Sequence, residues 1–136
     1  MSKVDCSKVY VKTSSFSIKS NEFDGAFANT DIKNGELVEM GIVRVLDNFD
    51  GMKNPHVFTW SDEIPNKTWA FTSGCATYYN TAKKGNANTI MKRCFKENRF
   101  EIYAVRDIKK DEELTHTYKS LEWREVFSEL NTILNQ

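Results

Sequence analysis

Residues 107–118 read DIKKDEELTHTY, and a shorter form of this phrase, DIKNGELV, stands at residues 31–38. In their wider contexts, ANTDIKNGELVE and AVRDIKKDEELT, the two copies share Ala, Asp, Ile, Lys and Glu at equal spacing. Each copy has the pattern of a strand end, a polar turn and the start of the next strand. We therefore predict two similar β units that face one another, with the repeat serving as scaffold. Only the second copy continues into a threonine and a tyrosine.

The length and composition fit one folded domain. The 136 residues are 40% hydrophobic and 28% charged, which is typical of globular proteins. Nineteen basic residues balance nineteen acidic ones, so no net charge directs the protein to nucleic acid or to a membrane. The N-terminus lacks the apolar run of a signal peptide, and no later stretch is long enough to span a bilayer. We expect a single domain over residues 1–136, inside a cell, either in the cytoplasm or in the host cell of a virus.

The cysteines and histidines suggest neither a metal centre nor a nucleophile. Cys6, Cys75 and Cys94 are odd in number and form no Cys-x-x-Cys pair, which disfavours a disulfide framework and a zinc site. The two histidines, His56 and His116, stand beside no serine or cysteine in a nucleophile motif. We therefore expect free thiols and no metal.

Most of the chain has the composition of short strands. β-branched and aromatic residues in approximate alternation mark residues 9–15, 36–46, 88–95 and 99–105. The three residues KEN between the last two segments suit a hairpin connection. Residues 46–56 combine Asn, Asp, Gly and Pro and are predicted to form a loop.

In the final segment, residues 119–136, the spacing of apolar residues changes from that of a strand to that of a helix. Ser120 suits a helix N-cap, and acidic residues follow it in the first turn. Apolar residues then recur at helical spacing, at Leu121, Trp123, Val126, Phe127, Leu130, Ile133 and Leu134. We predict a β core in residues 1–118 and one amphipathic α-helix in residues 119–136.

Five segments follow one another along the chain: DGAFA at 24–28, DIKNGELV at 31–38, HVFTW at 56–60, YYNTAKKGNAN at 78–88 and EELTHTY at 112–118. In this order they resemble the SET domain, the fold of S-adenosylmethionine-dependent protein lysine methyltransferases. The chain is most similar to the compact, stand-alone SET proteins of viruses and bacteria, which lack cysteine-rich zinc-binding flanks. The resemblance implies a mostly β, β-clip-like fold of short strands and small sheets, with a knotted C-terminal segment and one C-terminal α-helix.

The resemblance also implies an activity, methyl transfer from S-adenosylmethionine to the ε-amine of a lysine in a protein substrate. Tyr118 matches the active-site tyrosine of the family, whose hydroxyl orients the lysine nitrogen and the methyl group. The reaction needs an in-line approach and a neutral lysine. A dry channel and the positive charge of the cofactor both lower the pKa of the lysine, so no histidine base is required.

Asp24 and Gly25 correspond to the glycine-containing motif that approaches the cofactor closely in the family. Phe23 replaces the first glycine of that motif. Trp123, five residues beyond Tyr118, resembles an aromatic residue that packs on the adenine in short viral members. We predict that Asp24, Gly25 and Trp123 bind S-adenosylmethionine.

Asn80 matches the asparagine with which the family holds the amino-acid end of the cofactor. Thr81 stands where the family has a histidine, so its contact is made through the backbone or is weakened. Asn86, six residues after Asn80, resembles the second asparagine of the family segment N-H-S-x-x-P-N. We predict that Asn80 and Thr81 also bind the cofactor.

The stretch HVFTW is similar to an aromatic Y-x-F-x-W run of small bacterial members, with His56 in the place of the tyrosine. We predict that His56, Phe58 and His116 line the channel for the substrate lysine. His116 occupies a position that influences how many methyl groups are added, so mono-, di- and trimethylation stay open.

Two alternatives of other classes remain. One is a non-catalytic SET-like protein, motivated by Phe23, Thr81 and His116. The other is a β-clip binding module of the antifreeze or sialic-acid-synthase tail type, which shares the A-x-x-D-I-x-x-G-E turn but gives no reason for EELTHTY. For either enzyme or binder, a monomer or a homodimer is compatible with the sequence.

Overall fold

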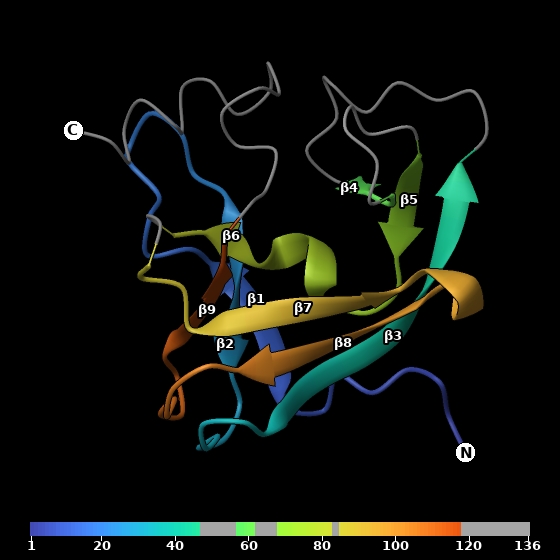
Figure 1. Ribbon diagram of the computed structural model, residues 1–136. Coiled ribbons are helices and arrows are strands. Elements are labelled where there is room, and N and C mark those ends of the chain that lie inside the picture. The colour runs from blue at the N-terminus through green and yellow to red at the C-terminus, as the bar shows by residue number, and fades with distance from the viewer. Residues whose placement is uncertain (47–56, 62–67, 83–84, 118–136) are drawn as a thin grey trace.

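The computed structural model describes residues 1–46, 57–61, 68–82 and 85–117 (Figure 1). These residues form two small sheets, a four-stranded one and a five-stranded one, joined by turns and short 3-10 helices. The mostly β fold of short strands and small sheets is therefore confirmed. The predicted C-terminal helix, the knotted C-terminal segment and residues 47–56 of the predicted loop lie outside the described residues. No helix in the described ranges combines the length and the apolar character needed to cross a membrane.

The smaller sheet has the order β1-β2-β9-β6. Its strands are β1 (Val9–Thr13), β2 (Asp24–Ala28), β9 (Glu113–His116) and β6 (Asn80–Thr81). The β1–β2 and β2–β9 pairs are antiparallel, whereas β6 runs parallel to β9. This sheet therefore joins three parts of the chain that are far apart in sequence.

The larger sheet has the order β4-β5-β3-β8-β7. Its strands are β4 (Phe58–Thr59), β5 (Trp69–Thr72), β3 (Leu37–Leu46), β8 (Arg99–Ala104) and β7 (Thr89–Cys94). The first half of β3 pairs with β8 and its second half pairs with β5, so this long strand holds the sheet together. Figure 1 shows β3, β8 and β7 as one layer.

The β7–β8 hairpin agrees with its prediction from the alternating sequence. Its connection contains the short 3-10 helix η3 (Phe95–Glu97) and then Asn98, whose φ of 50° is left-handed. Asparagine tolerates this conformation better than most residues. Along β8, Phe100 and Ile102 face the core and are almost fully buried, as strand alternation requires.

The two copies of the repeated phrase fold into matching turns. In the first, the backbone N–H of Lys33 donates to the Glu36 carboxylate at 3.1 Å. In the second, the backbone N–H of Lys109 donates to the Glu112 carboxylate at 3.3 Å. Each glutamate thus closes the turn that precedes its own strand, which explains why the repeat retains it.

The two turns also hold each other in a reciprocal way. The backbone N–H of Asn34 donates to Asp107 Oδ1 at 2.9 Å, and that of Lys110 donates to Asp31 Oδ1 at 2.9 Å. Backbone hydrogen bonds in both directions join the isoleucines of the two copies, Ile32 and Ile108. The predicted pair of β units that face one another is therefore confirmed.

β3 departs from regular alternation near its start. Its register against β8 shifts between Leu37 and Glu39, and both Val38 and Glu39 are buried. A bulge of this kind turns consecutive side chains toward the same side. It brings the Glu39 carboxylate into the interior, next to the short 3-10 helix η2 (Ala76–Tyr78).

Candidate functional site

The parallel pairing of β6 with β9 brings two of the predicted functional segments together. Asn80 lies opposite Thr115 and Thr81 lies opposite His116 in this pair. The backbone N–H of Ala82 extends the contact by donating to the His116 carbonyl at 2.9 Å. The asparagine segment and the EELTHTY motif are therefore neighbours in space, although more than thirty residues of sequence separate them.

Asp24, Gly25 and Asn80, three of the residues predicted to bind a cofactor, meet at one place. The Asn80 side-chain N–H₂ donates to the Asp24 carbonyl at 3.1 Å and to Glu113 Oε2 at 3.1 Å. A Cβ added at Gly25 would lie 2.5 Å from Glu113 Oε2 and 3.0 Å from Asn80 Nδ2. Only glycine lets the backbone approach these two side chains so closely. We call the surface formed by Gly25, Asn80 and Glu113 the Gly25–Asn80 wall.

Glu113 is a site residue that the sequence interpretation missed. Its carboxylate accepts hydrogen bonds from Ser14 Oγ at 2.7 Å, from the Ser15 backbone N–H at 2.9 Å and from Ser15 Oγ. With Asn80 as a further donor, the carboxylate fastens the end of β1 to β9 and to β6. The EELT motif identified the family but gave no separate role to Glu113. The signal that could have found this role is the pair Ser14 and Ser15 at the end of a predicted strand, because two adjacent hydroxyl groups suit a carboxylate partner.

Phe23 and Thr81, the two residues that depart from the family pattern, differ in how they contribute to the structure. Phe23 takes part through its backbone: its carbonyl accepts from the Ser14 N–H at 2.8 Å and from Ser17 Oγ at 2.9 Å. Phe23 has no positive φ, so this position makes no conformational demand for glycine. Thr81 is almost fully buried, and its hydroxyl donates to the neighbouring Ala82 carbonyl at 3.4 Å. A threonine in this place therefore faces the interior.

Phe58 and His116, which were predicted to line a substrate channel, are in ring contact. Their ring centroids lie 6.2 Å apart, edge to face, and the centroid of the Tyr79 ring lies 6.0 Å from that of His116. Burial lowers the pKa of His116 to about 4, so the imidazole is uncharged at neutral pH. The remaining predicted site residues, His56, Tyr118 and Trp123, lie outside the described residues.

Acidification is expected to destabilise the protein through His116. The pKa of a histidine is about 6.5 in an unfolded chain and about 4 in this folded one. Between these values the unfolded chain binds the additional proton, so stability falls as the pH falls. From pH 7 to pH 5 the loss is about 2 kcal/mol.

The measurement is urea unfolding of the wild type and of His116→Phe at pH 7 and at pH 5. Phenylalanine keeps a ring in this place and removes the titrating group. The variant should lose less stability than the wild type over this interval by about 2 kcal/mol. An equal loss in both proteins would exclude His116 as the cause.

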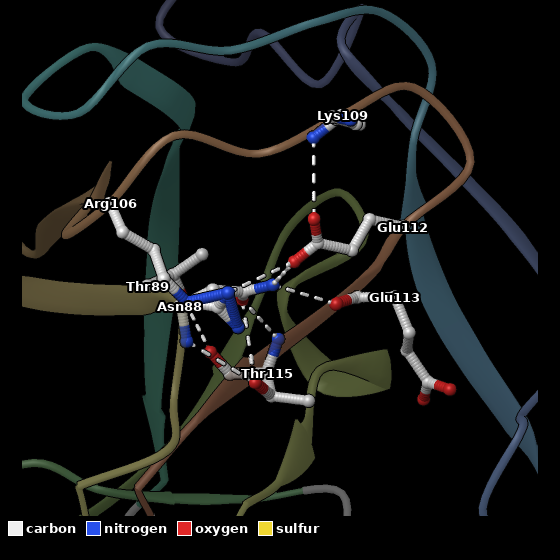
Figure 2. Close-up of polar contacts among 7 residues, drawn as sticks. All are labelled: Asn88, Thr89, Arg106, Lys109, Glu112, Glu113 and Thr115. Atoms are coloured by element: carbon white, nitrogen blue, oxygen red, sulfur yellow. Dashed lines mark hydrogen bonds and ion pairs between the residues drawn. The ribbon is translucent and has the colours of Figure 1, made fainter.

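Asn88 fastens β9 to the segment that precedes β7 (Figure 2). Its side-chain oxygen accepts from the Thr115 backbone N–H at 2.8 Å, and its side-chain N–H₂ donates to the Glu113 carbonyl at 2.8 Å. The same N–H₂ donates to the Glu112 carboxylate at 3.0 Å, and Asn88 is only 1% exposed. Asn86, which was matched to the second asparagine of the family, is exposed instead. Asn88, two residues after Asn86, is therefore a buried asparagine that holds β9 in place.

Comparison with known proteins agrees with this geometry. The SET domain family model matches residues 24–119, which include the Gly25–Asn80 wall and the EELTHTY motif. No curated protein matches the chain.

Solved structures share the fold at low sequence identity. A candidate histone methyltransferase of Plasmodium falciparum is 20% identical, with a TM-score of 0.61 over 82% of this chain and 92% of that one. The Polycomb Repressive Complex 2 of Chaetomium thermophilum is 23% identical, with a TM-score of 0.60 over 81% of this chain and 15% of that one. A form of that complex bound to GSK126 is 22% identical, with a TM-score of 0.61 over 93% of this chain and 17% of that one. The chain thus spans most of the first structure and a small part of the others. Because the family model covers most of its length, the chain belongs to the SET domain family.

Proposed function

We propose that the protein transfers a methyl group from S-adenosylmethionine to the ε-amine of a lysine in a protein substrate. The observation that carries this proposal is the Gly25–Asn80 wall. It unites two separate family motifs and adjoins β9, the strand that leads toward Tyr118. Membership of the SET domain family supports the same conclusion.

The residues of the wall fit S-adenosylmethionine. The missing side chain at Gly25 lets Asn80 and Glu113 lie against the backbone of β2, and Asn80 offers an amide that can both donate and accept. Glu113 adds a carboxylate, which favours a cofactor that carries a sulfonium and an ammonium group. When bound, the cofactor supplies an electrophilic methyl group. We assign Asp24, Gly25, Asn80, Thr81 and Trp123 to its binding.

The rings of Phe58 and His116 provide apolar surroundings for a substrate lysine, which must lose its charge before it can accept a methyl group. Neutralising an ordinary lysine at pH 7 costs roughly 4–5 kcal/mol, from a pKa of about 10.4. Phe58 and the uncharged ring of His116 form an apolar surface, and such surroundings lower the pKa of a lysine. We propose that these two residues, with His56, line the lysine channel.

The activity is tested with a methyl-labelled cofactor and a mixture of cellular proteins. After incubation with the purified chain, the proteins are hydrolysed and the labelled amino acids are separated. We expect the label on methylated lysine. Label on other residues only, or no label above the level without the protein, would contradict the proposed activity.

Asn80→Ala should weaken the binding of S-adenosylmethionine by about 1–3 kcal/mol, or roughly 5- to 150-fold. The change removes the amide and leaves polar partners in the wall without a hydrogen bond. Calorimetric titration with S-adenosylmethionine measures the affinity. Asn86→Ala is the matched control, because Asn86 is an exposed asparagine of the same segment and should bind like the wild type. If both variants bind equally well, Asn80 is not a cofactor residue.

A non-catalytic SET protein is the second candidate, and the buried Thr81 favours it. Its hydroxyl is directed to its own neighbour, whereas the family histidine at this position takes part in holding the cofactor. Binding of S-adenosylmethionine without any labelling of lysine would select this candidate. The binding module of the antifreeze or sialic-acid-synthase tail type does not account for the family match.

A further inference from the structure

A second polar cluster lies in the interior, apart from the Gly25–Asn80 wall. Cys6 precedes β1, Glu39 lies on β3 and Cys75 directly precedes η2. One ligand atom from each of these three residues lies within 4.8 Å of the other two. The spacing of the cysteines in the sequence disfavoured a zinc site, but folding brings two of them together beside a carboxylate from a third segment.

The backbone around this cluster is shaped to admit the Glu39 carboxylate. The bulge in β3 turns the side chain inward, where it is 1% exposed. Gly74 has a φ of +66°, and a Cβ at this position would collide with Glu39 Oε2. The Cys75 backbone N–H donates to the carboxylate at 2.8 Å, and Tyr79 Oη donates at 3.0 Å. These two hydrogen bonds hold the carboxylate in one position close to both thiols.

The cluster lacks a positive partner within the described part of the chain. No ion pair there joins a basic side chain to Glu39, and the nearby Asp5 adds further negative charge. Burying an uncompensated charge is costly, so a bound cation would stabilise this arrangement.

We propose that Cys6, Glu39 and Cys75 bind one zinc ion, with a water molecule as the fourth ligand. Zinc accepts thiolate and carboxylate ligands in a tetrahedral arrangement, at about 2.3 Å from sulfur and about 2.0–2.2 Å from oxygen. These lengths place two sulfur ligands about 3.8 Å apart. The three ligand atoms lie within 4.8 Å of one another, so binding zinc would need shifts of at most about 1 Å.

The choice of ion follows from the ligands. Soft thiolates select zinc over magnesium and calcium, which prefer oxygen ligands. Each of the two thiols releases its proton to solvent when it binds the ion. Bound zinc would fasten the segment before β1 to β3 and to the start of η2. Tyr79 donates to Glu39 and directly precedes Asn80 in the chain. By fixing Glu39, the ion would also help to hold Asn80 of the Gly25–Asn80 wall in position.

The test is calorimetric titration of the full chain, without an affinity tag and fully reduced, with zinc. Native mass spectrometry gives the number of ions bound. We expect one zinc per wild-type chain. Loss of an outer partner of a metal site weakens binding about 10- to 100-fold, so loss of a ligand should cost about a hundredfold or more. Cys6→Ser and Cys75→Ser should show this loss.

Cys94→Ser is the matched control, because Cys94 is also a half-buried free cysteine and lies outside the cluster. It should bind zinc like the wild type. A second measurement uses the unaltered protein: zinc should slow the alkylation of Cys6 and Cys75 by iodoacetamide and leave the rate at Cys94 unchanged. The proposal is wrong if no zinc binds, if the Cys6 and Cys75 variants bind it as tightly as the wild type, or if all three cysteines are protected equally.

Discussion

Tyr118→Phe should lower the rate of methyl transfer about a hundredfold to a thousandfold. Tyr118 lies outside the described residues, and its proposed role rests on the resemblance of the EELTHTY motif to the family pattern. In the proposed mechanism its hydroxyl orients the lysine nitrogen and the transferred methyl group. Removal of one preorganised hydrogen-bonding group typically costs about 2.7–4 kcal/mol in the transition state. The ring stays, so packing and cofactor affinity should change little.

The measurement compares labelled lysine formed by the wild type and by Tyr118→Phe at saturating S-adenosylmethionine. Tyr10→Phe is a matched control, because Tyr10 is a tyrosine of β1 whose hydroxyl donates to Asp111 at 2.8 Å. It should leave the methylation rate nearly unchanged. Equal labelling by wild type and Tyr118→Phe would remove Tyr118 from the chemistry, whereas no labelling by either protein would favour the non-catalytic candidate.

Asn88→Ala should lower the free energy of unfolding by about 2–5 kcal/mol. The change leaves the Thr115 backbone N–H and the Glu113 carbonyl without their side-chain partner. Each buried polar group that loses its hydrogen bond costs about 1–3 kcal/mol. Because both groups belong to β9, the loss acts on the strand that carries the EELTHTY motif. Urea unfolding measures the effect as a shift of the midpoint.

Asn88→Asp separates hydrogen bonding from packing. Aspartate has nearly the same size and keeps an acceptor for Thr115, but it loses the donor and places a second carboxylate beside Glu112. It should therefore also destabilise the protein. Asn86→Ala, at an exposed position, should stay within about 0.5 kcal/mol of the wild type. An Asn88→Asp protein as stable as the wild type would mean that only the volume of Asn88 matters.

Patterns along the sequence were sufficient to predict those strands and turns whose structure depends mainly on their own residues. Alternation over 36–46 and 99–105 predicted β3 and β8 because half of each strand faces a core. The repeated turn was also readable, since a glutamate three residues after the first turn residue closes it locally. Strands of two or four residues, such as β6 and β5, carry too few positions for a period to be detected.

Residues whose roles depend on distant partners could not be assigned in this way. Glu113 became a site residue because folding places two serines and Asn80 around it. The sequence singled out Asn86 by its spacing from Asn80, but it gave no sign that Asn88 is buried and holds β9. Glu39 lies in a segment that was predicted only to be a strand, and the bulge that turns it inward occurs in the pairing of β3 with β8. In each case the deciding contact joins segments that a pattern along the chain does not connect.

The central position of β9 in the smaller sheet has a consequence for biosynthesis. β9 lies between β2 and β6, yet it is translated after both of them. A nascent chain that has exposed β2 and β6 therefore has no strand to join them, and closing such long loops is slow. We expect Gly25 and Asn80 to become neighbours only after residues 113–116 have left the ribosome. Until then the Gly25–Asn80 wall, the proposed binding surface for S-adenosylmethionine, is incomplete.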